Sequence, residues 1–226
     1  MIDYLALIDK YYGDKPELRH ILVTHSRQVA DRALAIVDAH PEWVNEGLVD
    51  KTFIEEAAML HDIGILYCNA PKIFCTGPHK YIEHGYLGAE LLRAEGLPKH
   101  ALVAERHTGT GITIEQVERE ELPIPERDYC PQSLEEKIIC YADKFYSKSH
   151  LGEEVALEKI KYNIWKYGHD AIIRWQELEK LCNYNSRTLG LYYYLNRWLK
   201  PMESNSRNCI FAFVSPSLIT VLSYLG

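Results

Sequence analysis

Residues 53–64 read FIEEAAMLHDIG, and this segment decides the fold class. Residues 57–60 are apolar on every side of a helix, which predicts a buried helix over residues 53–62. His61 and Asp62 come at its end, and Gly64 is a candidate helix stop. Burying an ionised carboxylate without a partner costs several kcal/mol, so a polar pair at the end of a buried helix predicts a partner for it.

The segments on either side also favour helices. Residues 18–36 repeat apolar residues at steps of three and four, and His25 falls on that apolar face. Ser133 followed by Glu136 has the spacing of a capping box and predicts another helix start. Further helices are expected over residues 81–95, 98–107, 153–181 and 188–199, with irregular chain over residues 67–80 and 112–132. No alternating strand pattern persists, so we expect an all-α, compact multi-helix bundle over residues 1–182, with a helical and apolar C-terminal extension over residues 183–226.

Composition narrows the class of protein. The 226 residues are 47% hydrophobic and 25% charged, as in a folded globular protein, and the net charge of −7 argues against a protein that coats nucleic acid. The six cysteines form no Cys-x-x-Cys pair, and the first residues lack a basic stretch before an apolar run, so we expect a cytoplasmic protein. Residues 210–225 are apolar but shorter than the roughly 20 residues of a membrane span, so they are expected to pack on the core or to form an oligomer contact.

Six residues on five predicted helical segments place a histidine or an aspartate where an apolar side chain would be expected: His25, His61, Asp62, His84, His107 and Asp143. A single shared partner, a metal centre in the core, explains them together. Imidazoles and carboxylates suit divalent Mn, Fe, Co, Ni or Zn. The two oxygens of the Asp62 carboxylate could bridge two such ions.

The order of these residues resembles the defining pattern of the HD-domain superfamily of metal-dependent phosphohydrolases, and His61-Asp62-Ile63-Gly64 resembles the motif of its HDIG subgroup. Residues 83–92, 106–109 and 142–144 are similar to the remaining motifs, and the resemblance covers residues 18–150. It implies two ions per chain. One would be held by His25, His61, Asp62 and Asp143, and the other by His84 and His107, with Asp62 bridging.

The resemblance also implies an activity, which is hydrolysis of a phosphoester or phosphoanhydride by a metal-activated hydroxide. His61, Asp62 and Lys144 are the expected catalytic residues. A small phosphorylated substrate, nucleotide-like, is the expected partner, with no nucleic-acid polymer and no membrane span. The candidate contacts to its phosphate are Lys144, Arg106, Lys148 on the helix of Asp143, and His79 and Lys80 in the loop before His84.

Several alternatives stay open. Cyclic di-GMP is disfavoured, because Arg106-His107 stands where the HD-GYP branch has paired histidines and residues 110–113 stand at its Gly-Tyr-Pro segment. The His-Thr-Gly run at residues 107–109 resembles the diadenosine tetraphosphate hydrolase branch. Outside hydrolysis, a dinuclear-iron oxygenase and a non-catalytic metal-binding signalling module are the two rival functions.

Overall fold

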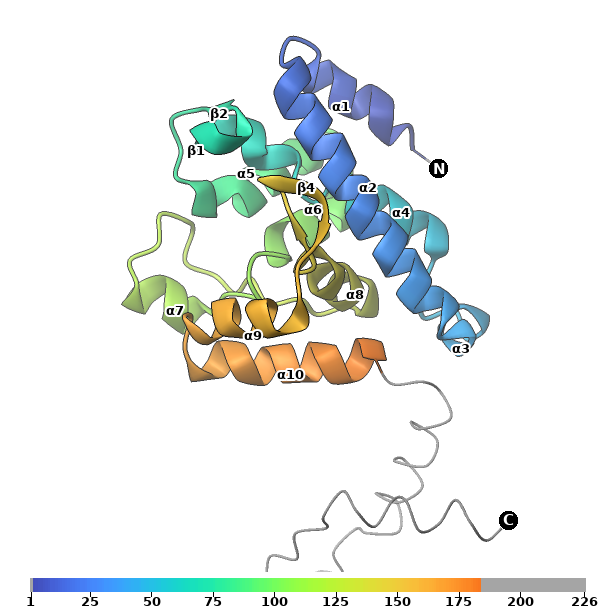
Figure 1. The fold of residues 1–226 in the computed structure, drawn as a ribbon. Helices are drawn as coiled ribbons and strands as arrows, with labels where there is room; N and C mark the ends of the chain where they lie inside the picture. The colour runs from blue at the N-terminus through green and yellow to red at the C-terminus, as the bar shows by residue number, and fades with distance from the viewer. Residues whose placement is uncertain (1, 184–226) are drawn as a thin grey trace, which may run out of the picture. The chain divides into compact units, whose positions relative to one another are not determined.

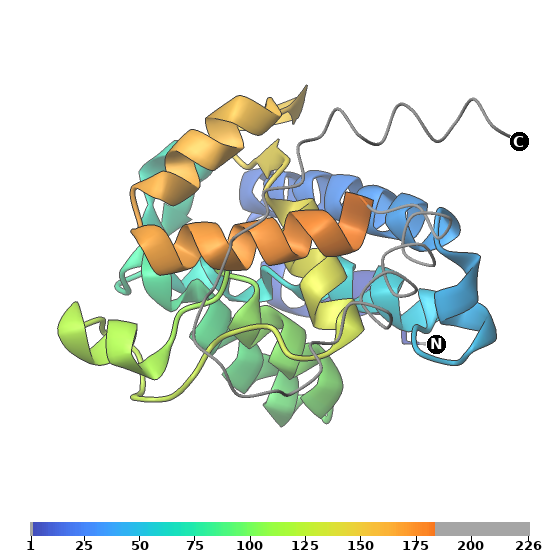
Figure 2. The ribbon, with the colours of Figure 1, turned by 90° about the horizontal axis from the view of Figure 1, so that it is seen from below.

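The computed structural model describes residues 2–183 (Figures 1 and 2). These residues form ten α-helices: α1 (Tyr4–Tyr12), α2 (Pro16–Asp38), α3 (Pro41–Asn45), α4 (Lys51–Leu60), α5 (His84–Ala94), α6 (Pro98–Arg106), α7 (Ile114–Arg119), α8 (Leu134–Asp143), α9 (Leu157–Trp165) and α10 (His169–Asn183). Short 3-10 helices and strands connect them: η1 (Ile63–Tyr67), β1 (Asn69–Ala70), η2 (Pro71–Ile73), β2 (Cys75–Thr76), η3 (Tyr81–Glu83), β3 (Tyr146–Ser147) and β4 (His150–Glu154). The strands pair antiparallel, β1 with β2 and β3 with β4. The all-α fold class is therefore confirmed.

The long helix α2 organises the core, because α4 and α8 both pack against it (Figure 1). Asp50 caps the start of α4 by accepting a hydrogen bond from the backbone N–H of Thr52 at 2.8 Å. The buried apolar side chains of the three helices include Leu22, Val29, Ile54, Leu60, Ile138 and Tyr141. This packing brings His25 of α2 toward the end of α4, where His61 and Asp62 lie.

The segment after α4 is held by a tyrosine from α1. The buried hydroxyl of Tyr12 donates to the carbonyl oxygen of Ile63 at 2.6 Å and accepts from the N–H of Leu66 at 3.3 Å. Both groups belong to η1, whose short turns leave few internal hydrogen bonds. Tyr12 therefore fixes the chain directly after Asp62.

Gly64 does not stop a helix, so that prediction is wrong. Gly64 is a buried residue of η1, and it allows η1 to pack closely against α5. A Cβ atom at Gly64 would lie 2.1 Å from the carbonyl oxygen of His84 and 2.4 Å from the backbone nitrogen of Gly88. Only glycine lets the backbone of η1 approach α5 this closely, and the approach sets His84 beside Asp62.

Helix α8 begins as predicted but ends early. Ser133 accepts a hydrogen bond from the N–H of Glu136, whereas the Glu136 carboxylate accepts from the N–H of Gln132, so only half of the capping box forms. The helix ends at Asp143, and the chain turns into the hairpin of β3 and β4. Lys148 lies in the turn between these strands and not on the helix of Asp143, which corrects its predicted placement.

Several other segments differ from expectation or lie outside the described residues. Residues 112–132 are not wholly irregular, because they contain α7, whose start Thr113 caps by accepting from the N–H of Gln116. Residues 67–80 contain the β1–β2 hairpin, and residues 153–181 begin with the end of β4 before α9. The predicted helix over residues 188–199 and the apolar stretch over residues 210–225 lie outside the described residues, as does the predicted extension apart from Asn183. Within residues 2–183, no helix is long and apolar enough to cross a bilayer.

The contact between η1 and α5 generates a stability prediction. We expect Gly64→Ala to lower the free energy of unfolding by about 3 kcal/mol, because the added methyl group must push apart two backbones. Denaturant unfolding followed by circular dichroism measures this loss. Gly88→Ala is the matched control, since its Cβ would lie 3.0 Å from its nearest neighbour, the Gly64 nitrogen, and should cost less. A loss in Gly88→Ala as large as that in Gly64→Ala would contradict this prediction.

Candidate metal centre

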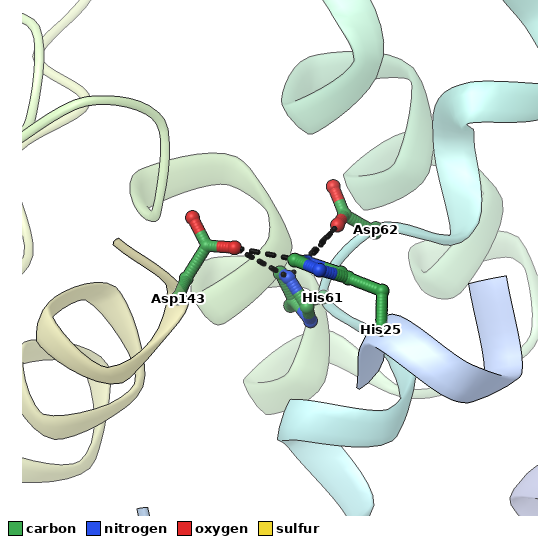
Figure 3. Close-up of side chains that lie close together, drawn as sticks. All are labelled: His25, His61, Asp62 and Asp143. Atoms are coloured by element: carbon green, nitrogen blue, oxygen red, sulfur yellow. Dashed lines mark hydrogen bonds and ion pairs between the residues drawn. The ribbon is translucent and has the colours of Figure 1, made fainter. Parts of the chain in front are cut away.

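Four side chains from three parts of the chain converge in the core (Figure 3). His25 comes from α2, His61 and Asp62 follow α4, and Asp143 ends α8. His25 Nε2 lies 3.1 Å from Asp62 Oδ2 and 3.0 Å from Asp143 Oδ1. His61 Nε2 lies 2.9 Å and 3.4 Å from the same two oxygens. All four residues are buried, and we call them the first cluster.

A second cluster shares Asp62. His84 Nε2, at the start of α5, and His107 Nε2, directly after α6, each lie 3.3 Å from Asp62 Oδ1. The two Nε2 atoms are 3.1 Å apart, and both histidines are buried. The carboxylate of Asp62 therefore turns one oxygen toward each cluster.

The backbone fixes which nitrogen of three histidines faces the clusters. The Nδ1 atoms of His61, His84 and His107 lie 2.6–2.8 Å from the carbonyl oxygens of the residues three positions earlier: Ala58, Tyr81 and Ala104. A carbonyl oxygen can only accept, so each Nδ1 carries the proton and donates it. In a neutral ring this leaves the lone pair on Nε2, the form in which imidazole binds a metal.

The spacing of the cluster atoms fits a bound metal ion. Two ligand atoms that are each about 2.1 Å from one ion lie about 3.0 Å apart at a right angle and about 3.4 Å apart in a tetrahedron. Nearly all the distances above fall within this interval. Asp62 Oδ1 and His61 Nε2 are fully buried, yet neither has a partner with hydrogen-bond geometry within residues 2–183. Groups that are close but not hydrogen-bonded are expected where a bound ion would satisfy them.

Two partly buried lysines balance the carboxylates. Lys144 Nζ lies 2.6 Å from Asp143 Oδ2, and Lys148 Nζ lies 2.6 Å from Asp62 Oδ2. Burial alone would raise the pKa of Asp143, but the charge of Lys144 holds that pKa well below its usual range. Burial likewise opposes a charge on Lys148, yet Asp62 raises its pKa above the ordinary value. Both carboxylates are therefore ionised, as metal ligands must be.

The histidines differ in their charge. Burial lowers the pKa of His84 to about 3 despite the nearby Asp62, so this ring is neutral. Burial also lowers the pKa of His107. At His61 burial acts in the same direction, but the charges of Asp62 and Asp143 outweigh it and raise the pKa to about 9. His61 is the ring most strongly held between the two carboxylates.

An open cavity of about 410 Å³ lies beside the two lysines that pair with Asp143 and Asp62, and we call it the basic cavity. Lys144 and Lys148 line it, together with Tyr81 and Lys72. Tyr81 stacks on the ring of His84 at 4.7 Å between centroids and lies 6.0 Å from Lys148 Nζ. Sequence reasoning missed Lys72 and Tyr81, since neither belongs to a motif. A single aromatic and a single loop lysine give no local signal.

Three candidate phosphate contacts do not line the basic cavity. Arg106 pairs with the buried carboxylate of Glu136 at 3.1 Å, an ion pair that ties α6 to α8. His79 Nδ1 lies 2.9 Å from Glu83 Oε2, and the backbone N–H of the exposed Lys80 donates a hydrogen bond to the same carboxylate. These contacts are structural, whereas Lys144 and Lys148 face the clusters and the cavity together.

The loop after His107 is anchored on two sides. The carbonyl oxygen of His107 accepts a hydrogen bond from Lys144 Nζ at 3.0 Å and another from the thiol of Cys140. Farther along, Arg174 of α10 donates to the carbonyl oxygens of Thr110 and Gly111. Gly111 has φ +93°, a conformation that favours glycine. The anchored loop fixes His107 at the second cluster.

Comparisons with known proteins agree with this geometry. A family model described as the HD domain matches residues 22–147, a span that contains all six cluster residues. Proteins named tRNA (cytidine(56)-2'-O)-methyltransferase from Picrophilus torridus and Thermoplasma volcanium are 31% and 29% identical over 72% and 70% of this chain. An uncharacterized protein from Methanocaldococcus jannaschii is 40% identical over 52% of this chain. No solved structure matches.

The chain spans only part of these relatives: 42% and 41% of the two methyltransferases and 66% of the third protein. The family match, in contrast, covers more than half of this chain and includes the helices that carry both clusters. The chain therefore belongs to the HD domain family.

Proposed function

We propose that this chain is a metal-dependent phosphohydrolase of the HDIG subgroup, which cleaves a phosphoester or phosphoanhydride. The observation that carries the proposal is the shared carboxylate. Asp62 Oδ2 belongs to the first cluster and Asp62 Oδ1 to the second, so one side chain could bridge two ions. Paired ions joined by a bridging ligand suit in-line displacement at phosphorus.

Two divalent ions, drawn from Mn, Fe, Co, Ni and Zn, would occupy the two clusters. When bound, such ions activate a water molecule and neutralise charge on the phosphoryl oxygens. His61 and Asp62 act by holding these ions. The backbone hydrogen bonds at Nδ1 of His61, His84 and His107 keep the ligand nitrogens aimed without rearrangement.

Lys144 and Lys148 supply the contacts to phosphate. In the structure their ammonium groups pair with the Asp143 and Asp62 carboxylates. Metal ions bound to those carboxylates would neutralise them in place of the lysines. The lysines would then be surplus positive charges at the wall of the basic cavity. A phosphate is the ligand that satisfies such a site, with Lys72 binding it from the exposed side.

The substrate we propose is small and nucleotide-like, in keeping with a cavity of about 410 Å³. Methyl transfer to tRNA, which the names of two relatives describe, is not carried over, because this chain spans less than half of those proteins. Cytoplasmic location, the absence of a nucleic-acid partner and an oligomer contact through residues 210–225 stay predictions.

Metal content tests the ligand assignment. Full-length protein reloaded with Mn, Fe, Co, Ni or Zn and then desalted should hold two ions per chain by elemental analysis. His107→Ala should hold one, because the first cluster stays complete, and Asp62→Asn should hold fewer than one. Glu105→Gln is the control, since this buried acid pairs with Arg93 outside both clusters and should keep two ions. One ion in the wild-type protein would contradict the dinuclear assignment.

Phosphate release tests the activity. The reloaded protein should release phosphate from at least one member of a panel of nucleotides, dinucleoside polyphosphates and sugar phosphates, and a chelator should abolish the release. We expect Asp62→Asn to lower the rate by at least about 100-fold, with Glu105→Gln again as control. No turnover on any substrate, with Asp62→Asn affecting stability alone, would favour the non-catalytic module. Oxygen uptake by the iron-loaded protein would favour the oxygenase.

Two of the three lysines of the basic cavity, Lys144 and Lys72, should affect different kinetic constants. Lys144→Met should lower kcat by about 100-fold, because its ammonium group lies beside the reacting centre. Lys72→Met should raise KM severalfold and leave kcat unchanged, because an exposed contact binds substrate and transition state equally. Lys159→Met, on an exposed position of α9 outside the cavity, should change neither constant. Unchanged kinetics in Lys144→Met would exclude its catalytic role.

A further inference from the structure

A second cavity, of about 270 Å³, shares two wall elements, η3 and α9, with the basic cavity. In η3, Tyr81 lines the basic cavity and the next residue, Ile82, lines the second cavity. In α9, Asn163 and Ile164 are divided between the two cavities in the same way. Most of the wall around Ile82 and Ile164 is apolar, with Leu122 contributing from the loop after α7. We call this the apolar cavity. The helices α7, α9 and α10 that surround it gather at the same end of the described unit (Figure 1).

Residues close in the chain to the second cluster line the apolar cavity. Thr108 and Gly109 line it and directly follow His107, while Ile82 lies two residues before His84. A group bound in this cavity would therefore lie next to the two segments that carry His84 and His107. The basic cavity is therefore linked to the first cluster through Lys144 and Lys148, and the apolar cavity to the second cluster through Thr108 and Gly109. This arrangement suits a ligand that has a charged end and an apolar end.

Two polar features in the apolar cavity indicate the kind of apolar group. Gln116 of α7 is only 8% exposed, and its side-chain amide has no hydrogen-bond partner among the described residues. An amide offers one donor and one acceptor group side by side. Tyr167, which is 62% exposed, lies at the opening and presents a free aromatic ring. Such rings stack on planar ligands.

The charges in the wall exclude a charged group. Arg174 and Glu120 carry opposite charges, and the Arg174 guanidinium is already bonded to the carbonyl oxygens of Thr110 and Gly111. The cavity thus has no surplus charge for an anion, in contrast to the three lysines of the basic cavity.

We propose that the apolar cavity binds an uncharged heteroaromatic ring with a donor and an acceptor at its edge, the chemistry of a nucleobase. Gln116 would bond to the edge of the ring, and Tyr167 would cover its face. The inference rests on the proposed function, because it takes this ring to be the part of the substrate that is linked to the phosphate in the basic cavity. Gln116 is then a specificity-determining residue.

Binding of nucleosides without phosphate tests this assignment. Adenosine, guanosine, cytidine and uridine are titrated into the full-length chain by calorimetry in the presence of a chelator, so that neither metal nor hydrolysis is needed. At least one should bind saturably. Gln116→Leu should weaken that binding about tenfold, the effect of one lost hydrogen bond, and Leu122→Trp should block it by filling the cavity. Glu118→Leu, on the exposed side of the same helix α7, should leave it unchanged.

Two results would overturn the proposal: no binding of any of the four nucleosides, or binding that Gln116→Leu and Leu122→Trp leave unaltered. Circular dichroism checks that each variant folds. If Leu122→Trp does not fold, Tyr167→Ala replaces it, because that exposed side chain can be removed without opening the core. Phosphate release without nucleoside binding would refute the ring site and keep the hydrolase, so the two proposals fail separately.

Discussion

The structure depends on two carboxylates, Asp62 and Asp143, that are ionised in an interior with almost no access to water. Such charges are costly unless other groups surround them closely. Each carboxylate has a lysine at 2.6 Å, and four imidazoles occupy the remaining space around their oxygens. The helices α2, α4, α5, α6 and α8 are arranged so that these groups reach one point. The arrangement of the core follows from that requirement as much as from apolar packing.

Helix ends make the arrangement possible. The last carbonyl groups of a helix have no partner within the helix. His61 and His107 each follow a helix directly, and His84 follows η3 in the same way. Each ring uses one of the free carbonyl oxygens to hold its Nδ1–H and thereby turns Nε2 into the core. The same positions satisfy the backbone and prepare a ligand, which explains why these three histidines sit at helix ends, whereas His25 lies within α2.

The sequence predicted the helices and cluster residues whose signals are local. Apolar spacing located α2 and α4, and polar residues on apolar faces marked the cluster residues. What it missed depends on contacts between distant segments. Gly64 packs against Gly88 of α5, and Lys148 returns to Asp62 only because α8 ends at Asp143 and the chain folds back as a hairpin. Helix α7 could have been found, since Thr113 and Gln116 have capping-box spacing, but its six residues are too few for periodicity.

The balance of charge separates a catalytic role for metal from a structural one. The two lysines already pair with the two carboxylates, and apolar side chains pack the core around them, so charge balance alone does not require an ion. Two divalent ions would instead leave a net charge of about four positive units in a buried centre. A structural site would gain nothing from such an excess, whereas a site that binds and cleaves a phosphate needs it. The lysines therefore favour chemistry over support as the reason for the clusters.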